Sequence, residues 1–223
     1  LSYSQSTYIT WHLLIKVINI ALSCHSIYMT EAFDRNGYLY VPDAVDFKSL
    51  YCSPPVDKEG QRITGMERHF KHQKPEFKSM EPQVNGSLAR YNHPFYRKAH
   101  YSLMKKIEGI LSMDLLPTYY FDRFYYEGQE LTRHKDRPSC EISATVQIST
   151  NRDEAWPIWF QRPDQTENSV SMKNGDMVLY KGCEREHWRE PLTGKDSYHH
   201  QIFFHYVNAQ GPYVHYAYDR GVG

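Results

Sequence analysis

A histidine and an aspartate stand two positions apart, at His134 and Asp136, in the stretch ELTRHKDRPSCEISATVQIS of residues 130–149. In an extended strand, side chains at positions i and i+2 point to the same face. If this stretch is extended, the imidazole and the carboxylate share one space and supply two ligands for a metal ion. The same pair on a solvated surface would have no function, so the motif alone leaves both interpretations open.

A metal site needs a third protein ligand, and a late strand of the same sheet system is its expected source. His187 is the best candidate because it follows a turn and a strand in NGDMVLYKGCERE. Two histidines and one carboxylate form the facial triad of non-haem Fe(II) oxygenases, which leaves coordination positions open. We therefore predict that His134, Asp136 and His187 bind a metal. The other histidines after position 134 are His199, His200, His205 and His215.

The composition restricts the classes of protein to consider. The chain has 223 residues, which suits one domain with a sizeable core. Lys and Arg together number 26, and Asp and Glu together also number 26. Nucleic-acid-binding proteins usually have an excess of basic residues, so we expect no nucleic-acid partner. The 19 Tyr, 10 Phe and 4 Trp favour strands. Four cysteines without a CxxC pair predict reduced thiols rather than a disulfide scaffold.

The first 28 residues differ in character from the rest of the chain. Their apolar run WHLLIKVINIALS carries Lys16 and is short for a membrane span; a weak signal or anchor segment is a second interpretation, although no clean A-x-A cleavage site follows. We expect no membrane partner and a cytoplasmic protein. Met29 opens MTEAFDRNGYLYVPDAV, which is typical of a domain start. We predict that residues 1–28 are an upstream extension and that residues 29–223 form a single domain. A helix packed on that domain is the alternative for the first segment.

The elements expected after the N-terminal segment change from helical to β-like. Residues 93–113 predict a helix with one apolar face and with Pro94 in its first turn, where proline is tolerated. Residues 37–45 predict a strand that ends at Pro42. After Pro117, short β-like runs alternate with turns, of which Asn174-Gly175 is the strongest. This order predicts an α+β, mainly β fold, with N-terminal helices packed on an antiparallel sandwich or barrel.

The segment FYYEGQELTRHKD resembles a motif of the prolyl-4-hydroxylase-like 2-oxoglutarate oxygenases, with Tyr125, Gly128, His134 and Asp136 at the matching positions. Downstream, NGDMVLYKGCEREHWREPLTGK resembles the turn, strand, distal histidine, proline and basic residue of that family. The resemblance covers roughly residues 32–215 and looks closest to a poorly characterised branch from microbes and phages. It implies a double-stranded β-helix, or jelly roll, with its core at about residues 117–208.

The resemblance also implies Fe(II), 2-oxoglutarate as cosubstrate, O₂, and ascorbate as an optional reductant. The distal carboxylate of 2-oxoglutarate needs a cation to bind it. In the resembling enzymes this cation usually lies where the present chain has Ser197, so Lys195 is the nearest match. Arg189 is a rival, and Tyr125 could donate its hydroxyl to the same carboxylate. Two residues of a later β-like run, His199 and Gln201, are further rivals.

The function implied by the resemblance is hydroxylation of a C–H bond, with release of succinate and CO₂. The substrate is a peptide or a small molecule, and peptidyl proline, a free amino acid and a small metabolite all stay open. Arg133 and Arg137 flank the metal motif and could meet an acidic substrate, or they could be solvated charges at the rim. The alternatives are a cupin-like metal-binding protein without turnover and a zinc hydrolase, whose metal also takes three protein ligands.

Overall fold

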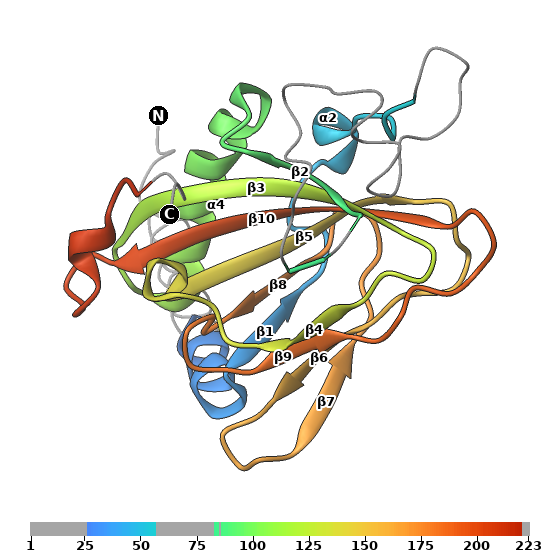
Figure 1. The fold of residues 1–223 in the computed structure, drawn as a ribbon. Coiled ribbons are helices and arrows are strands. Elements are labelled where there is room, and N and C mark those ends of the chain that lie inside the picture. The colour runs from blue at the N-terminus through green and yellow to red at the C-terminus, as the bar shows by residue number, and fades with distance from the viewer. Residues whose placement is uncertain (1–25, 57–82, 85, 220–223) are drawn as a thin grey trace, which may run out of the picture.

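The computed structural model describes residues 26–56, 83–84 and 86–219. In this part of the chain two sheets face each other, as Figure 1 shows. The larger has six strands in the order β1-β8-β5-β10-β3-β2, and the smaller has four in the order β4-β9-β6-β7. All neighbouring strands are antiparallel. The strands are β1 Tyr38–Val41, β2 Leu88–Tyr91, β3 Leu115–Tyr126, β4 Leu131–His134, β5 Ile142–Thr150, β6 Ile158–Gln161, β7 Glu167–Val170, β8 Met177–Tyr180, β9 His187–Arg189 and β10 Tyr198–Asn208.

The strand order identifies the fold. From β3 onward the chain alternates between the two sheets. Strands β3, β5, β8 and β10 lie in the larger sheet, and strands β4, β6, β7 and β9 lie in the smaller sheet. As a result β10 lies between β5 and β3, and β9 lies between β4 and β6. Two facing antiparallel sheets with this interleaved order form a jelly roll. The predicted double-stranded β-helix is therefore confirmed.

Helices cover the outer face of the larger sheet. The predicted helix at 93–113 is found as a 3-10 turn, η1 Pro94–Tyr96, followed by α4 Arg97–Leu111. It ends where Ser112 adopts a left-handed conformation with φ 49°. Residues 26–36 form another helix, and α2 Phe47–Leu50 is a single turn. The domain boundary predicted between residues 28 and 29 lies inside the helix at 26–36, and residues 1–25 lie outside the described residues.

The two faces of β10 have different surroundings. Ile202, Phe204 and Tyr206 belong to the same buried cluster as residues of α4 such as Leu103 and Ile107. Side chains alternate along a strand, so the odd-numbered residues of β10 point toward the smaller sheet. The interior between the two sheets therefore receives His199, Gln201, Phe203 and His205, which the sequence alone could not decide.

Local signals in the sequence account for the turns around the sheets. The predicted strand at 37–45 is β1, which ends directly before Pro42. The predicted Asn174-Gly175 turn precedes β8, and Gly175 has φ +96° with the Val45 carbonyl 3.0 Å from where a Cβ would lie. The described cysteines, at 52, 140 and 183, are free thiols, as predicted. Within the described residues no helix has the length and apolar character needed to span a membrane.

Candidate metal centre

The three predicted metal ligands meet between β4 and β9 of the smaller sheet. His134, the last residue of β4, pairs in register with His187, the first residue of β9. Asp136 follows two positions after His134, and its Oδ1 lies 3.4 Å from His134 Nε2 and 3.6 Å from His187 Nε2. One ligand atom from each residue lies within 4.8 Å of the others. The pairing of two strands that are far apart in the sequence thus assembles a two-histidine, one-carboxylate group.

Backbone carbonyls orient both imidazole rings. His134 Nδ1 lies 2.7 Å from the carbonyl oxygen of Thr132, and His187 Nδ1 lies 3.1 Å from that of Arg185. A carbonyl oxygen only accepts hydrogen bonds, so each Nδ1 must carry the proton. Each Nε2 therefore has a lone pair directed toward the shared space, which is the tautomer of a metal-binding histidine held by an outer partner.

The carboxylate of Asp136 is held in place and ionised. Its backbone N–H donates to the Gly182 carbonyl at 2.9 Å, and Ser143 Oγ donates to Oδ2 at 3.2 Å. Burial acts to raise the pKa of Asp136, but His187 and His134 hold that pKa well below its usual value. Burial lowers the pKa of His187, which favours the neutral, metal-binding form of that ring. Two neutral imidazoles and one carboxylate fit a divalent transition metal such as Fe(II).

Gly182 permits the close approach of Asp136 to the next turn. A Cβ at this position would lie 2.6 Å from Asp136 Oδ2 and 2.6 Å from Ser143 Oγ, and it would also meet the carbonyl oxygen of Cys140. Real Cβ contacts are longer than this, so any side chain at position 182 would displace the carboxylate or its partners. The sequence contained this glycine, in YKGCERE, but no local pattern linked it to the metal motif.

A cavity of about 210 Å³ opens beside the triad. Aromatic rings form much of its wall, and Tyr91, Phe121 and Phe203 lie in a stack with ring centres 4.8 and 4.6 Å apart. Among the described lining residues the charged side chains besides Asp136 are all basic. The charged and titratable lining residues are Arg123, His134, Lys135, Asp136, Arg137, His187 and His205, together with Tyr91, Tyr119, Cys140 and Tyr180.

Arg189 is a buried cation two residues after His187 on the same strand. Its side chain points to the same side as His187, and the residue is only 1% exposed. Nη1 donates to the Trp156 carbonyl, whereas Nε and Nη2 have no hydrogen-bond partner among the described residues. Burial lowers the pKa of Arg189 to about 10, so the side chain is still charged at neutral pH. Two buried N–H groups of this cation thus have no partner among the described residues.

Tyr125 and His199 surround the same buried cation. The Arg189 guanidinium lies 4.6 Å from the centre of the Trp156 ring, which contacts the rings of Tyr125 at 5.0 Å and His199 at 5.1 Å. Lys195, by contrast, is exposed in the loop between β9 and β10. The structure therefore brings Arg189 and Tyr125 into the interior and leaves Lys195 outside it.

Arg123 lines the cavity, although no sequence motif indicated it. It is fully buried on β3, donates from Nη1 to the Tyr125 hydroxyl at 3.0 Å, and donates from Nη2 to Gln83 Oε1 at 3.0 Å. In the β-like run TYYFDRFYY, which follows Pro117, Arg123 precedes Tyr125 by two residues. Strand alternation could therefore have placed Arg123 beside Tyr125 on the interior face.

Arg133 and two of the tryptophans lie on another surface. Arg133 forms ion pairs with Glu167 and Glu186, and its guanidinium lies 4.3 Å from the Trp188 ring centre. Trp188 in turn stacks on Trp159 at 6.0 Å. None of these five residues lines the cavity. Arg133 is therefore a solvated charge beside the metal motif, whereas Arg137 does line the cavity.

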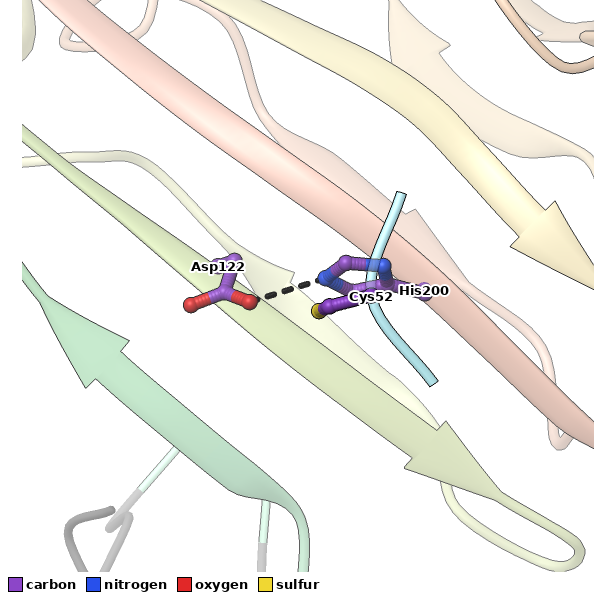
Figure 2. A group of neighbouring side chains, drawn as sticks. All are labelled: Cys52, Asp122 and His200. Atoms are coloured by element: carbon purple, nitrogen blue, oxygen red, sulfur yellow. Dashed lines mark hydrogen bonds and ion pairs between the residues drawn. The ribbon is translucent and has the colours of Figure 1, made fainter. Parts of the chain in front are cut away.

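A second group of ligand-type side chains, Cys52, Asp122 and His200, lies on the opposite face of the larger sheet (Figure 2). His200 Nε2 lies 2.8 Å from Asp122 Oδ2. Arg90 already donates to the Asp122 carboxylate and lies 3.0 Å from Cys52 Sγ. Because a guanidinium stands where a metal cation would have to bind, this group is an ion-pair network and not a metal site.

Comparison with known proteins supports the same fold. No protein-family model and no curated protein sequence matches the chain. Among solved structures, the non-haem α-ketoglutarate-dependent epimerase SnoN of nogalamycin biosynthesis has a TM-score of 0.60 at 13% identity, over 86% of this chain and 82% of that chain. A Pseudomonas putida prolyl-4-hydroxylase has a TM-score of 0.54 at 15% identity, over 81% of this chain and 98% of that chain.

The chain has the fold of the 2-oxoglutarate oxygenases. A prolyl hydroxylase from Trichoplax adhaerens, solved with a peptide of hypoxia inducible factor, shares it with a TM-score of 0.55 at 12% identity, over 90% of this chain and 94% of that chain. The predicted prolyl-4-hydroxylase-like fold is thereby confirmed. The narrower assignment to a microbial and phage branch stays a prediction.

Proposed function

We propose that this protein is a non-haem Fe(II)- and 2-oxoglutarate-dependent dioxygenase that hydroxylates a C–H bond of a peptide or small molecule and releases succinate and CO₂. The observation that carries the proposal is the group His134, Asp136 and His187 at the cavity of an oxygenase fold. Solved structures of this fold include HygX with nickel and 2-oxoglutarate bound and SnoN with Fe³⁺ and α-ketoglutarate, which supports the same two partners here.

The three ligands would hold Fe(II) through His134 Nε2, Asp136 Oδ1 and His187 Nε2. When bound, the metal supplies the activation of O₂ for which protein side chains have no equivalent. The carbonyls of Thr132 and Arg185 keep both imidazoles in the metal-binding tautomer. Ser143 and the backbone N–H of Asp136 keep the carboxylate in place, so the ligand set is organised before the metal arrives.

Arg189 is the residue that we propose to bind the distal carboxylate of 2-oxoglutarate. Residues i and i+2 of a strand are roughly 6.6 Å apart, which is comparable with the length of a five-carbon diacid. A cosubstrate with one end at His187 can therefore reach Arg189 along β9, where two N–H donors have no described partner. Tyr125 packs against the same Trp156 ring as Arg189, and its hydroxyl is the proposed second contact. Lys195 has less support because it is exposed, and ascorbate as a reductant stays a prediction.

The experiment is oxygen consumption and succinate formation by the full chain with Fe(II) and 2-oxoglutarate. We expect succinate from the wild type and none from His134→Ala, Asp136→Ala or His187→Ala, with unchanged circular dichroism. His215→Ala is the matched control, because His215 does not line the cavity. Metal binding without succinate would favour the cupin-like alternative, and hydrolysis supported by zinc would favour the hydrolase.

A further inference from the structure

We propose that His205 is a positioning residue of the metal centre, which holds the Asp136 carboxylate in place through the hydroxyl of Ser143. The inference rests on the proposed function and extends it to a residue that is not a ligand. His205 lies on β10 and Ser143 on β5, where the two pair directly across the larger sheet. His134 and His187 belong to the smaller sheet, and Asp136 follows β4 of that sheet. Two side chains of the larger sheet thus reach the ligands of the smaller one.

Three polar groups lie within hydrogen-bond distance of the Ser143 hydroxyl. Its Oγ lies 3.2 Å from Asp136 Oδ2, 3.2 Å from the Cys140 carbonyl oxygen and 2.9 Å from His205 Nδ1. The carboxylate and the carbonyl only accept hydrogen bonds. A hydroxyl has one proton to donate, and a charged acceptor forms the stronger bond, so this proton points to Asp136. His205 Nδ1 is then the donor to Ser143.

The surroundings of the other ring nitrogen support this direction of donation. His205 Nε2 is buried and has no hydrogen-bond partner among the described residues. A neutral ring with its proton on Nε2 would leave that proton without an acceptor. It would also take the Ser143 proton, and two acceptor oxygens 3.2 Å from Oγ would then receive none. Buried polar groups without partners cost free energy, so the tautomer with its proton on Nδ1 is favoured.

Aromatic packing fixes the position of the His205 ring. The residue is 2% exposed, and its ring centre lies 4.6 Å from that of Tyr119 and 5.7 Å from that of Phe121. A donor held in this way fixes the rotamer of Ser143, and Ser143 in turn holds Asp136 Oδ2. The other carboxylate oxygen, Oδ1, is left to face the Nε2 atoms of both ligand histidines, at 3.4 and 3.6 Å.

The test is calorimetric titration of Mn(II) into the full chain, with two substitutions that separate the roles of the two ring nitrogens. His205→Asn places its amide N–H near the position of Nδ1, so it should keep most of the Mn(II) affinity. His205→Gln places its amide near the position of Nε2 and loses the donor to Ser143, so affinity should fall by about tenfold, as for other outer partners of metal ligands. His199→Gln, on the same strand and face, is the matched control and should change nothing.

A double-mutant cycle tests whether His205 acts through Ser143. Ser143→Ala should lower Mn(II) affinity by about ten- to a hundredfold. His205→Gln added to that variant should lower it no further, because the hydroxyl between the two groups is already gone. Thr145→Val is the control for Ser143→Ala, since it removes another buried hydroxyl of β5, one without a hydrogen-bond partner among the described residues. It should leave the affinity unchanged.

Additive losses in the cycle, or equal Mn(II) affinities of His205→Asn and His205→Gln, would overturn the inference. If His205→Gln does not fold, nitrogen-15 NMR of the histidine-labelled, metal-free wild type decides in its place: a proton on Nδ1 of His205 supports the inference, and one on Nε2 overturns it. Mn(II) binding with the expected cycle, in a protein that makes no succinate, would reject the proposed function alone. Succinate formation by a wild type whose cycle is additive would reject this inference alone.

Discussion

At the scale of single residues, Gly182 leaves room for the Asp136 carboxylate of the proposed metal centre. Gly182→Ala should lower Mn(II) affinity by at least tenfold, because the added Cβ would lie 2.6 Å from Asp136 Oδ2 and must displace it. Titration calorimetry measures the effect. Gly109→Ala is the control, since a Cβ there meets nothing within 4 Å; it should keep the metal affinity and stabilise helix α4 by up to ~1 kcal/mol. Normal metal binding by Gly182→Ala would show that the carboxylate can move freely.

Substitutions of Arg189 and Lys195 are expected to affect the 2-oxoglutarate requirement differently. Arg189→Gln should raise the 2-oxoglutarate concentration needed for half-maximal succinate formation by about ten- to a hundredfold, because a charge-assisted hydrogen bond is lost. Lys195→Gln should leave it unchanged, since this side chain is exposed in the loop between β9 and β10. Metal affinity serves as the internal control in both variants. If Lys195→Gln raises this concentration and Arg189→Gln does not, Lys195 is the residue that binds the distal carboxylate.

At the scale of elements, Asp122 ties β2, β3 and β10 together on the outer face of the larger sheet. It is fully buried and accepts from Arg90, from Tyr96 at 3.1 Å and from His200 at 2.8 Å. Asp122→Asn should cost roughly 3–5 kcal/mol of unfolding free energy, because it leaves the Arg90 charge buried without its carboxylate. Urea unfolding measures this cost. Asp114→Asn, near the sheet but not in this network, should change stability little, and an equal loss there would refute the explanation.

Helix α4 contacts the sheet through His100, which makes this contact sensitive to acid. Its Nε2 lies 3.1 Å from the His205 carbonyl, and burial lowers the pKa of His100 from 6.5 to about 4. The unfolded chain therefore binds the proton first, and stability is complete above pH 6.5 and falls as the pH drops toward 4. This residue's share is roughly 3 kcal/mol, at 1.36 kcal/mol per pKa unit. Unfolding free energies at several pH values should show a weaker acid dependence in His100→Gln than in wild type, and an identical dependence would contradict the assignment.

At the scale of the whole molecule, the proposed metal centre joins β4 and β9, which are far apart in the sequence but are neighbours in the smaller sheet. A ligand that binds only the folded state at a hundred times its Kd adds about 2.7 kcal/mol to stability. For a chain of 223 residues this predicts a rise in Tm of about 5–10 °C with Mn(II), reversed by a chelator. Thermal scanning should show no rise for His187→Ala and a full rise for His215→Ala. An equal shift in both variants would place the bound metal elsewhere.

Features that depend only on neighbouring residues could be predicted from the sequence. The helix at 93–113, the strand before Pro42 and the turn at Asn174-Gly175 follow from periodicity and from the backbone preferences of proline and glycine. The pair His134 and Asp136 also belongs to this class, because two residues of one short stretch always stay close together.

Which distant residues meet depends on how the two sheets and helix α4 pack together. His187 joins the pair because β9 pairs with β4, and a one-residue slip of that register would turn its side chain to the outer face. Lys195 had the better position in the sequence but lies in an exposed loop, whereas Arg189 and Arg123 point inward from β9 and β3. The physical reason is the same in each case: strand alternation is local, but the face that becomes the interior is chosen by the packing of the second sheet and of helix α4 on the first.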